Sequence, residues 1–357
     1  MVGRCIGSLL PCAGKPAESD YTHMRRVALV VVHFRTIADT LECLASALAL
    51  TVPAGSIVKI ILVDNASNDG SWDRLVQWAC RRKLFWRALL DKAELPGGVD
   101  LGIGFRFGDS DAEIVLLRSE RNDGYAAGCN LGIQFALAEP ATTDFWILNS
   151  DVLFEQEALQ QLLAASDGRA PAVYGSTLLY QDDPGTIQAA GGAVYWPLLG
   201  RSRHRGKGQR IDRYPRVARH LDYIVGAAMF FSRHVIESVG LFPESLFLYF
   251  EETEWCARAR ERGYEMVWVP ESRVVHKEGK STGAGDRFRK LSNLSFRYMV
   301  RNSLLFSHAR YRFGLPTVML WNCGESIWYW IKGDRKKFNV FLNAVREYWG
   351  QRSSLTI

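Results

Sequence analysis

Two runs near the start of the chain are almost wholly apolar and rich in β-branched residues. They are VALVVVHF at residues 27–34 and IVKIILVDN at residues 57–65. Continuous apolar runs of this length are typical of strands that are buried on both faces of a sheet. Between them, leucines and alanines recur at helical spacing over residues 39–50, and Asp39 is a suitable helix cap. The pattern therefore predicts a β-α-β unit.

The same alternation continues to about residue 180. Ser71 can cap a second helix, and residues 122–138 predict a glycine-bearing turn that enters a third. Further strands are expected at residues 113–120, 144–151 and 172–180, and a further helix at residues 155–166. Strands that alternate with helices indicate a parallel sheet with helices on its faces. Residues 83–112, with five glycines, interrupt the pattern as an insertion whose place the sequence does not give.

Beyond this point the pattern changes to antiparallel strands and then to helices. TIQAAGGAVYW predicts a hairpin, YIVGAAMFFS at residues 223–232 predicts a strand, and residues 253–263 predict a helix that ends at a glycine. From residue 286 the sequence is helical, aromatic and basic. The expected fold is α/β, with a domain over residues 25–285, a helical C-terminal segment over residues 286–357, and a disordered tail over residues 1–24.

Composition narrows the class of protein. The seven cysteines include no C-x-x-C pair, which argues against a disulfide framework and a structural zinc site and favours reduced thiols in a cytosol. No run reaches ~18 uninterrupted apolar residues, so no transmembrane helix is expected. The most apolar segment, residues 314–333, is broken by Asn322 and Glu325.

Positive charge is concentrated at the C-terminus. Residues 286–357 hold thirteen Lys or Arg against four acids, an excess of nine, whereas the whole chain has a net charge of +6. Four of the eleven tryptophans lie there too. Basic residues interleaved with aromatic ones suit an anionic membrane surface, and an ordinary amphipathic cap on the core is the alternative. The basic residues 201–219 either bind the pyrophosphate of an acceptor or form a solvated loop. No motif for binding nucleic acid is present.

Polar residues stand where the predicted strands end. In an open parallel sheet, ligands bind at the carboxyl ends of the strands. There the sequence places residues 33–36, 64–65, 118–124 and 149–151. Asp151 can hold a Mg²⁺ or Mn²⁺ that bridges two phosphates, although a helix cap is the simpler alternative for a single aspartate. The small residues of NDGYAAGCN allow the backbone to approach a phosphate. The alternative is that they only form a tight connection between a strand and a helix.

The stretch FLYFEETEWCARARERGY combines aromatic and acidic residues just before a predicted helix. Glu251, Glu252 and Glu254 suit the helix dipole, which is the simple explanation. Three neighbouring acids also repel one another, so at least one that is shielded by the aromatics should have a raised pKa, as a general base needs. His276 follows a predicted strand, and imidazole is a common metal ligand.

Taken in order, these motifs resemble glycosyltransferase family 2, and within it the rhamnosyltransferase-like branch that builds bacterial cell-surface polysaccharides such as the O-antigen of lipopolysaccharide. The resemblance covers residues 27–310. It implies a GT-A fold, with a Rossmann-like nucleotide-binding half over residues 25–151 and a mixed acceptor half over residues 152–285.

The resemblance also implies roles for single residues. Asp64 would contact the base, and in NSD Asp151 would bind the metal with Asn149 near the ribose. Glu252 would be the catalytic base with Glu251 beside it, and His276 a further metal or diphosphate ligand. The nucleotide and donor would be bound by His33, Arg35, Asp64, Asn65, Asn122, Gly124, Asn130, Asn149 and Gly226.

Two departures from the family pattern affect these expectations. The family has Thr-Tyr-Asn after the first strand, where this chain has His33, Phe34 and Arg35. Its E-D-x-D reads E-E-T-E here, and since glutamate is longer than aspartate, the base could be Glu251 or Glu252.

The expected activity is an inverting, metal-dependent transfer of a sugar to a hydroxyl of a lipid-linked glycan. The best candidate donor is dTDP-L-rhamnose, or a UDP-sugar, with Mg²⁺ or Mn²⁺ as cofactor. The enzyme would be cytoplasmic and attached peripherally to the inner membrane, with self-association left open. The alternatives are a sugar-phosphate nucleotidyltransferase, whose glycine-rich loop after the first strand is missing here, and a non-catalytic membrane-associated scaffold.

Overall fold

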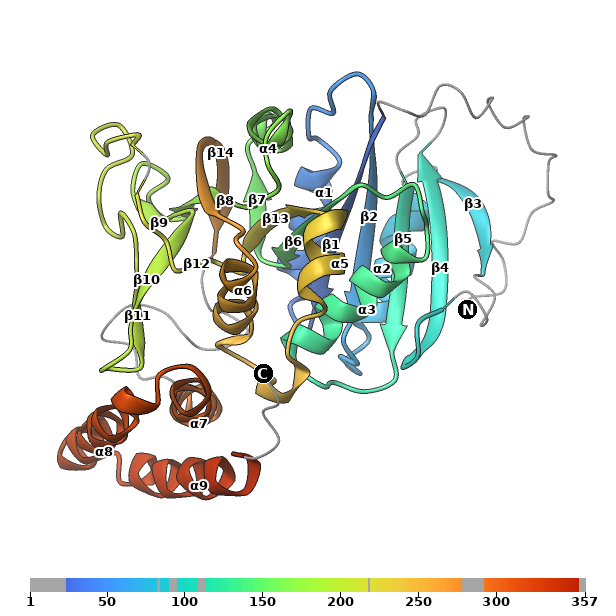
Figure 1. The fold of residues 1–357 in the computed structure, drawn as a ribbon. Coiled ribbons are helices and arrows are strands. Elements are labelled where there is room, and N and C mark those ends of the chain that lie inside the picture. Colours follow the sequence, from blue (N-terminus) through green and yellow to red (C-terminus); the bar gives the residue numbers. More distant parts are fainter. Residues whose placement is uncertain are drawn as a thin grey trace.

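The computed structural model describes residues 24–81, 84–89, 95–107, 113–217, 219–277 and 292–352. A large mixed sheet forms the centre, helices cover both of its faces, and three C-terminal helices form a layer below it (Figure 1). Most of the predicted tail, residues 1–23, lies outside the described residues.

The first part of the chain forms the parallel centre of the sheet. Strand β1 pairs in parallel with β2 on one side and with β6 on the other, and β2 pairs in parallel with β5. These strands are β1 (Arg25–His33), β2 (Ser56–Asp64), β5 (Glu113–Ser119) and β6 (Asp144–Asn149), and the helices between them are α1 (Ile37–Ala47), α2 (Ser71–Arg81) and α3 (Tyr125–Leu137). The β-α alternation predicted for this part is confirmed.

One predicted helix start is wrong. Helix α1 begins two residues before Asp39, with Thr36 at the N-cap position. Asp39 instead lies in the first turn, where its Oδ1 accepts a hydrogen bond from Lys277 Nζ at 2.9 Å. The carboxylate that was expected to cap the helix therefore binds the ammonium group of Lys277, a residue distant in the chain.

Residues 83–112, which the sequence could not place, contribute two strands at one edge of the sheet. Strand β3 (Leu84–Leu89) pairs with β4 (Val99–Phe107), and β4 pairs with β5, both antiparallel. The segment thus extends the sheet and lies on the opposite side of β5 from β2.

The second part of the chain extends the sheet on the other side of β6. The strand order is β3-β4-β5-β2-β1-β6-β13-β8-β14-β7, and β9 also pairs with β8. The added strands are β7 (Val152–Phe154), β8 (Val173–Tyr180), β9 (Ile187–Ala190), β13 (Ala228–Ser232) and β14 (Met266–His276), and the helices are α4 (Ala158–Ser166), α5 (Arg233–Val239) and α6 (Glu251–Glu261). Strand β13 is antiparallel to β6, so the parallel half meets a mixed half here.

Two further predictions are corrected in this half. Residues 223–232 are not one strand. They form β12 (Tyr223–Ile224) and β13, which belong to different sheets. Strand β12 joins a small sheet with β10 (Gly192–Trp196) and β11 (Arg201–His204). The basic segment 201–219 is therefore not all loop, because it begins with a strand.

The core has one apolar layer on each face of the large sheet. Helices α1, α2 and α4 cover one face and α3, α5 and α6 the other (Figure 1). A third cluster lies among the C-terminal helices, which are α7 (Asn293–Arg310), α8 (Leu315–Ile331) and α9 (Lys336–Gln351). Among the described residues, no helix is long and apolar enough to cross a membrane.

Candidate active site

The carboxyl ends of the central strands bring the predicted polar residues together. In the sheet register, His33 lies beside Asp64, Asp64 beside Arg118, and Val32 beside Asn149. Parallel neighbours end at the same edge of a sheet, so residues from four separate segments meet there.

Hydrogen bonds tie the loops at this edge to one another. Asn65 Nδ2 donates to Asn122 Oδ1 at 3.1 Å and to the Gly124 carbonyl at 3.0 Å. Asp64 Oδ1 accepts from the Ser67 backbone N–H at 3.1 Å, and the hydroxyl of the same serine accepts from the Arg35 backbone N–H, also at 3.1 Å. Asp64 and Asn65 are both buried, so they fix the shape of the loops that line this edge.

His33 is fully buried beneath the edge, and burial lowers the pKa of its imidazole. Its Nδ1 lies 2.8 Å from Thr40 Oγ1, and that hydroxyl itself donates to the Thr36 carbonyl. We therefore assign the proton to Nδ1, which donates to the threonine. The ring is neutral and orients the start of α1.

Gly124 has a backbone conformation that other residues adopt only with strain. Its φ is +100°, and an added Cβ would lie 2.2 Å from the Phe247 carbonyl oxygen. The backbone N–H of Tyr125 donates to that same oxygen at 2.8 Å. The first turn of α3 is thus locked against the segment that leads into α6.

Asn130 belongs to a different contact from the other predicted donor-binding residues. Its Nδ2 donates to the Phe242 carbonyl at 2.9 Å and to Glu244 Oε1 at 2.7 Å, and its Oδ1 accepts from the Phe242 N–H at 2.9 Å. The buried amide therefore joins α3 to residues 242–244, which lie between α5 and α6.

Asp151 and His276 meet because β7 and β14 are antiparallel partners, with Val152 opposite His276. Asp151 Oδ1 lies 3.3 Å from His276 Nε2, and Asn149 Nδ2 lies 3.2 Å from the same nitrogen. Burial would raise the pKa of Asp151, but its hydrogen bond and its attraction to His276 outweigh burial, so the pKa is lowered and the carboxylate stays ionised.

Gln188 sets the orientation of the His276 ring. Its Oε1 lies 2.7 Å from His276 Nδ1, so Nδ1 donates a hydrogen bond to Gln188 and Nε2 is the nitrogen that faces Asp151. A metal-binding histidine is commonly held in this way by an acceptor on its other nitrogen. Sequence reasoning missed Gln188, and its only signal was a polar residue within an apolar strand run.

These residues fit a divalent cation that also binds a diphosphate. The described residues contain no group of three or more His, Cys, Asp or Glu side chains that could hold a metal. Asp151 and His276 nevertheless place an ionised carboxylate and an imidazole nitrogen 3.3 Å apart, and both are ligand types for a divalent cation. Mg²⁺ is typically bound by one or two carboxylates together with substrate phosphates and waters, so a small protein ligand set suits this chemistry.

The two glutamates at the start of α6 follow a strained turn. Phe247, Tyr249 and Phe250 have φ values of +59°, +67° and +73°, which bulky residues rarely adopt. Such strain is kept only where the surroundings enforce it, and it clusters at functional sites. Here it places Glu251 and Glu252 in the first turn of α6.

Both carboxyl groups are shielded from water. Burial, followed by the charge of Glu252, raises the pKa of Glu251 well above its usual value, and burial raises the pKa of Glu252 to about 7. The Oε2 atom of each has no hydrogen-bond partner among the described residues. Glu252 keeps part of its surface accessible, whereas Glu251 is 5% exposed, so Glu252 is better placed to meet a ligand.

Glu254 does not belong to this acidic pair. It binds Arg258 Nε at 2.9 Å and Arg310 Nη2 at 2.9 Å. The expected cluster of three acids is therefore reduced to two, because the third has cationic partners of its own.

Gly226 connects the metal-binding candidates to the glutamates. A Cβ added to Gly226 would lie 3.5 Å from Glu252 Cβ, and the next residue accepts a hydrogen bond from the Asn149 backbone N–H at 3.2 Å. Tyr125 Oη also donates to the Gly226 carbonyl at 3.1 Å. Residues 226–227 thus have the end of β6 on one side and the acid pair on the other.

The C-terminal layer reaches the same region through α7. Asn302 Nδ2 lies 2.7 to 2.9 Å from the carbonyl oxygens of Leu246, Leu248 and Tyr249. Arg301 Nη2 donates to the Leu246 carbonyl at 2.9 Å, and its Nε donates to Asn302 Oδ1 at 2.8 Å. These buried residues hold the strained turn, and nothing in the sequence around them singled them out.

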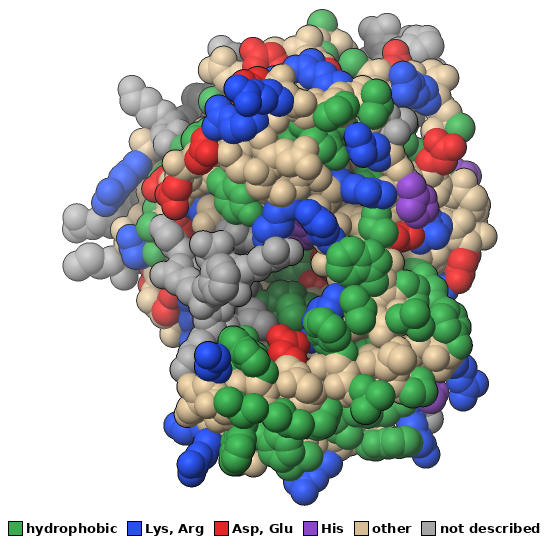
Figure 2. Space-filling view, turned by 90° about the vertical axis from the view of Figure 1, so that its left-hand side faces the viewer, with side chains coloured by type: hydrophobic (Ala, Val, Ile, Leu, Met, Phe, Trp, Pro, Cys, Tyr) green, Lys and Arg blue, Asp and Glu red, His purple; other side chains and the backbone are tan. Residues whose placement is uncertain are grey.

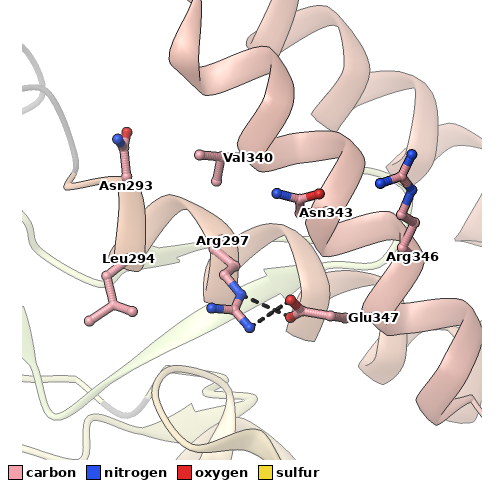
Figure 3. A pocket seen from close by; sticks show the side chains of 7 residues that line it. All are labelled: Asn293, Leu294, Arg297, Val340, Asn343, Arg346 and Glu347. Carbon is pink, nitrogen blue, oxygen red and sulfur yellow. Dashed lines mark hydrogen bonds and ion pairs between the residues drawn. The ribbon is translucent and has the colours of Figure 1, made fainter.

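A separate hollow lies between helices α7 and α9 of the C-terminal layer. Figure 3 shows its lining, which includes Asn293, Val340 and Asn343. Arg297 on α7 and Glu347 on α9 form an ion pair that joins the two helices, with 2.6 Å between Nη2 and Oε1 (Figure 3). No residue that the sequence predicted for the site lines this hollow, so the candidate site remains at the carboxyl ends of the strands.

The chain is similar to known proteins in its sequence. Residues 105–240 match the family described as Glycosyl transferase family 2. The low-salt glycan biosynthesis hexosyltransferase Agl10 of Haloferax volcanii is 27% identical over 175 residues, which are 46% of this chain and 52% of that protein. The N-acetylglucosaminyl-diphospho-decaprenol L-rhamnosyltransferase of Mycobacterium tuberculosis is 25% identical over 63% of this chain and 68% of its own length. The dTDP-rhamnosyl transferase RfbF of Shigella flexneri is 22% identical over 58% and 68%. The chain thus spans about half of Agl10.

Solved structures are similar to the chain in fold. TarS residues 1–349 from S. aureus superpose with a TM-score of 0.51 at 13% identity, covering 92% of this chain and 81% of that one. GalNAc-T7 with UDP, GalNAc and Mn²⁺ gives a TM-score of 0.53 at 13% identity, covering 81% and 51%. The structural neighbours have the GT-A fold, so the predicted fold class is confirmed.

Proposed function

Since residues 105–240 match glycosyl transferase family 2, we propose that the chain is an inverting glycosyltransferase. It moves a sugar from a nucleoside diphosphate to a hydroxyl of a growing, lipid-linked cell-surface glycan. The observation that carries this proposal is the placement of two groups around residues 226–227, with Asp151 and His276 near the end of β6 and Glu252 next to Gly226.

In the proposed reaction Glu252 is the general base. Its carboxylate accepts the proton of the acceptor hydroxyl as that oxygen forms a bond to the anomeric carbon. The bond between the anomeric carbon and the diphosphate oxygen breaks in the same displacement, so the configuration at that carbon inverts. A pKa of about 7 makes the carboxylate basic enough to take the proton near neutral pH while it remains largely ionised above that pH.

The diphosphate side of the site is assigned to Asp151 and His276. A bound Mg²⁺ or Mn²⁺ there would neutralise negative charge on the departing nucleoside diphosphate. Asp151 stays ionised, and His276 offers Nε2 because Gln188 holds its other nitrogen. Asp64 and Asn65 shape the loops on the base side, and the donor sugar would lie beside Gly226 and Glu252.

The donor and the acceptor are proposed from the named relatives. Two of them are rhamnosyltransferases, one named for dTDP-rhamnose and one for N-acetylglucosaminyl-diphospho-decaprenol. We therefore assign dTDP-L-rhamnose as donor and a polyprenyl-diphosphate-linked sugar as acceptor. Such an acceptor would bring the enzyme to the inner face of the cytoplasmic membrane as a peripheral protein.

A donor-turnover assay tests this assignment against its two rivals. The purified chain is incubated with dTDP-, UDP- and GDP-sugars, with Mn²⁺ or with EDTA, and release of the nucleoside diphosphate is measured with and without acceptor. Acceptor-dependent release from dTDP-rhamnose, lost in Glu252→Gln, supports the proposal. Turnover only with a nucleoside triphosphate and a sugar phosphate would indicate a nucleotidyltransferase, and no turnover with any substrate would favour the scaffold.

A further inference from the structure

Helix α8 presents an apolar face to the outside of the molecule. Apart from Trp330, its exposed large side chains recur at helical spacing and lie on one face of the helix. They are Leu320 (71% exposed), Trp321 (48%), Ile327 (42%), Trp328 (54%) and Ile331 (69%). Figure 2 shows hydrophobic side chains gathered over the lower part of the molecule, where the C-terminal helices lie.

The opposite face of α8 is buried, and it carries apolar residues such as Val318 together with polar ones. Asn322 and Ser326 are fully buried, and Asn322 donates to Ser303 Oγ at 3.0 Å and accepts from Arg201 at 2.8 Å. These hydrogen bonds fix the rotation of the helix, so its apolar face cannot turn inward without breaking them. Contiguous apolar patches on a protein surface mark contacts with a partner or a membrane.

The patch extends beyond α8. Trp196 at the end of β10 and Leu198 in the turn after it are exposed, and the Leu198 carbonyl accepts a hydrogen bond from Thr317 Oγ1 at 2.7 Å, which holds this turn against the start of α8. Phe313, just before α8, is 70% exposed. We call these residues and the five on α8 the apolar face.

Basic residues border the apolar face. Arg312 precedes α8, and Lys332, Arg335 and Lys336 follow it; all four are exposed. The only charged residue within α8 is Glu325, whose carboxylate is 2.6 Å from Arg201. The border therefore has a net positive charge although it includes Asp334, and Glu325 is neutralised by Arg201.

We propose that the apolar face is the surface by which the protein binds an anionic phospholipid bilayer. Its tryptophans and aliphatic side chains would enter the headgroup region, and the four basic residues would contact lipid phosphates. A second copy of the chain fits less well. In a two-fold dimer the same patch meets itself, which would bring the two positive borders together. An anionic lipid surface neutralises them instead.

This arrangement also brings the membrane close to the acid pair. Helix α7 packs against α8, and its Asn302 holds the turn before Glu251. Packed helices lie about 8–10 Å apart, so roughly one helix layer would separate the bilayer surface from that turn. The inference extends the membrane attachment proposed above, but it does not depend on the transfer chemistry.

Vesicle flotation with the full chain tests the proposal without donor or acceptor. The probe is phosphatidylcholine vesicles with or without phosphatidylglycerol. We expect binding to the anionic vesicles, a loss of roughly tenfold or more in Leu320→Ser/Trp321→Ser/Trp328→Ser, and a loss of about fivefold for each residue neutralised in Arg335→Gln/Lys336→Gln. Val52→Ser and Val217→Ser, exposed apolar residues outside the apolar face, are the matched controls and should bind like the parent.

Three outcomes would overturn the proposal. They are equal binding by the parent and the triple serine variant, equal binding to neutral and anionic vesicles, or absence of binding together with a dimer that the triple variant abolishes in light scattering. Unchanged thermal unfolding of each variant shows that it is folded. If the triple serine variant does not fold, Arg335→Gln/Lys336→Gln still tests the proposal, because it replaces no residue of the apolar face. Vesicle binding without sugar transfer would reject only the proposed function.

Discussion

The side-chain amide of Asn302 donates to the carbonyl of Tyr249 at 2.9 Å, two residues before the first glutamate of α6. The amide is fully buried, and it also reaches the carbonyls of Leu246 and Leu248. Tyr249 and Phe250 both have positive φ, at a cost of about 1–3 kcal/mol each. The C-terminal layer thus keeps the strained turn before α6 in a conformation that it would otherwise leave.

Replacing Asn302 with alanine should therefore impair catalysis more than substrate binding. The turn loses its buried donor, and each unsatisfied carbonyl costs about 1–3 kcal/mol. We expect a lower melting temperature and a fall in kcat of at least about tenfold, with a smaller change in the KM for the donor, because Asn302 bonds to residues 246–249 and not to the loops around Asp64.

Asn322→Ala is the matched control for that experiment. Asn322 is equally buried, but its partners are Arg201, Ser303 and the Val318 carbonyl, away from the turn. It should lose comparable stability and keep its kcat. Equal kcat losses in both variants would show that Asn302 acts only through general stability.

The activity should rise with pH through about 7 and then level off. A general base must be deprotonated, and burial raises the pKa of Glu252 to about 7. The pH profile of kcat/KM in the parent checks this, and Glu252→Gln should lower kcat by about 10²–10⁴-fold above pH 7 and remove the rise with pH. A profile that keeps its shape in Glu252→Gln but loses it in Glu251→Gln would move the base to Glu251.

The same two carboxyl groups should make the protein less stable as the pH rises. Their folded pKa values lie above the ordinary value of 4.5, so the folded state holds more protons than the unfolded state between these values. The free energy of unfolding should therefore fall from about pH 4.5 to about pH 7. Urea titrations across this range should show a shallower fall in Glu252→Gln, and an unchanged slope would contradict the assignment.

Gln188→Ala should weaken binding of Mn²⁺ in the presence of a nucleoside diphosphate by about 10–100-fold. The substitution leaves Asp151 and His276 in place but removes the acceptor that holds His276 Nδ1. Titration calorimetry with Mn²⁺ and dTDP measures this effect, with Asp151→Asn as the variant that lacks a direct ligand. An affinity equal to that of the parent would mean that His276 needs no support or binds no metal.

Gly124→Ala should unfold the protein more easily than an ordinary turn substitution. Gly55 provides the comparison, because it also has positive φ but has open space around its Cα. Gly55→Ala should cost about 1–2 kcal/mol from backbone strain alone. Gly124→Ala carries the same strain and adds a contact of 2.2 Å with the Phe247 carbonyl, so we expect a clearly larger loss in urea unfolding. Similar losses would show that this contact relaxes easily.

The sequence predicted the centre of the fold because the signals there are local. Apolar runs such as residues 27–34 and 57–65 are buried on both faces, as their composition required. Polar residues at the ends of those runs meet at one edge because parallel strands end together. For this reason, the pattern of residues alone is enough to place Asp64 and Asn149 at that edge.

The remaining parts depend on partners that are distant in the chain. Gln188 is 88 residues from His276, and Asn302 is 53 residues from Tyr249. The break between β12 and β13 is decided by which strands each one pairs with, and not by its own apolar sequence. Positive φ at Tyr249 and Phe250 contradicts the preference of bulky residues, so local reasoning could not find the strained turn.

The contact between α7 and the turn before α6 has a practical consequence for anyone who wishes to shorten the protein. A fragment that stops at Lys277 would retain the entire large sheet, Asp151, His276 and both glutamates. It would lose Arg301 and Asn302, and with them the hydrogen bonds that hold residues 245–249. Such a fragment should bind a nucleotide but have a very low kcat, although every residue assigned to the chemistry is still present.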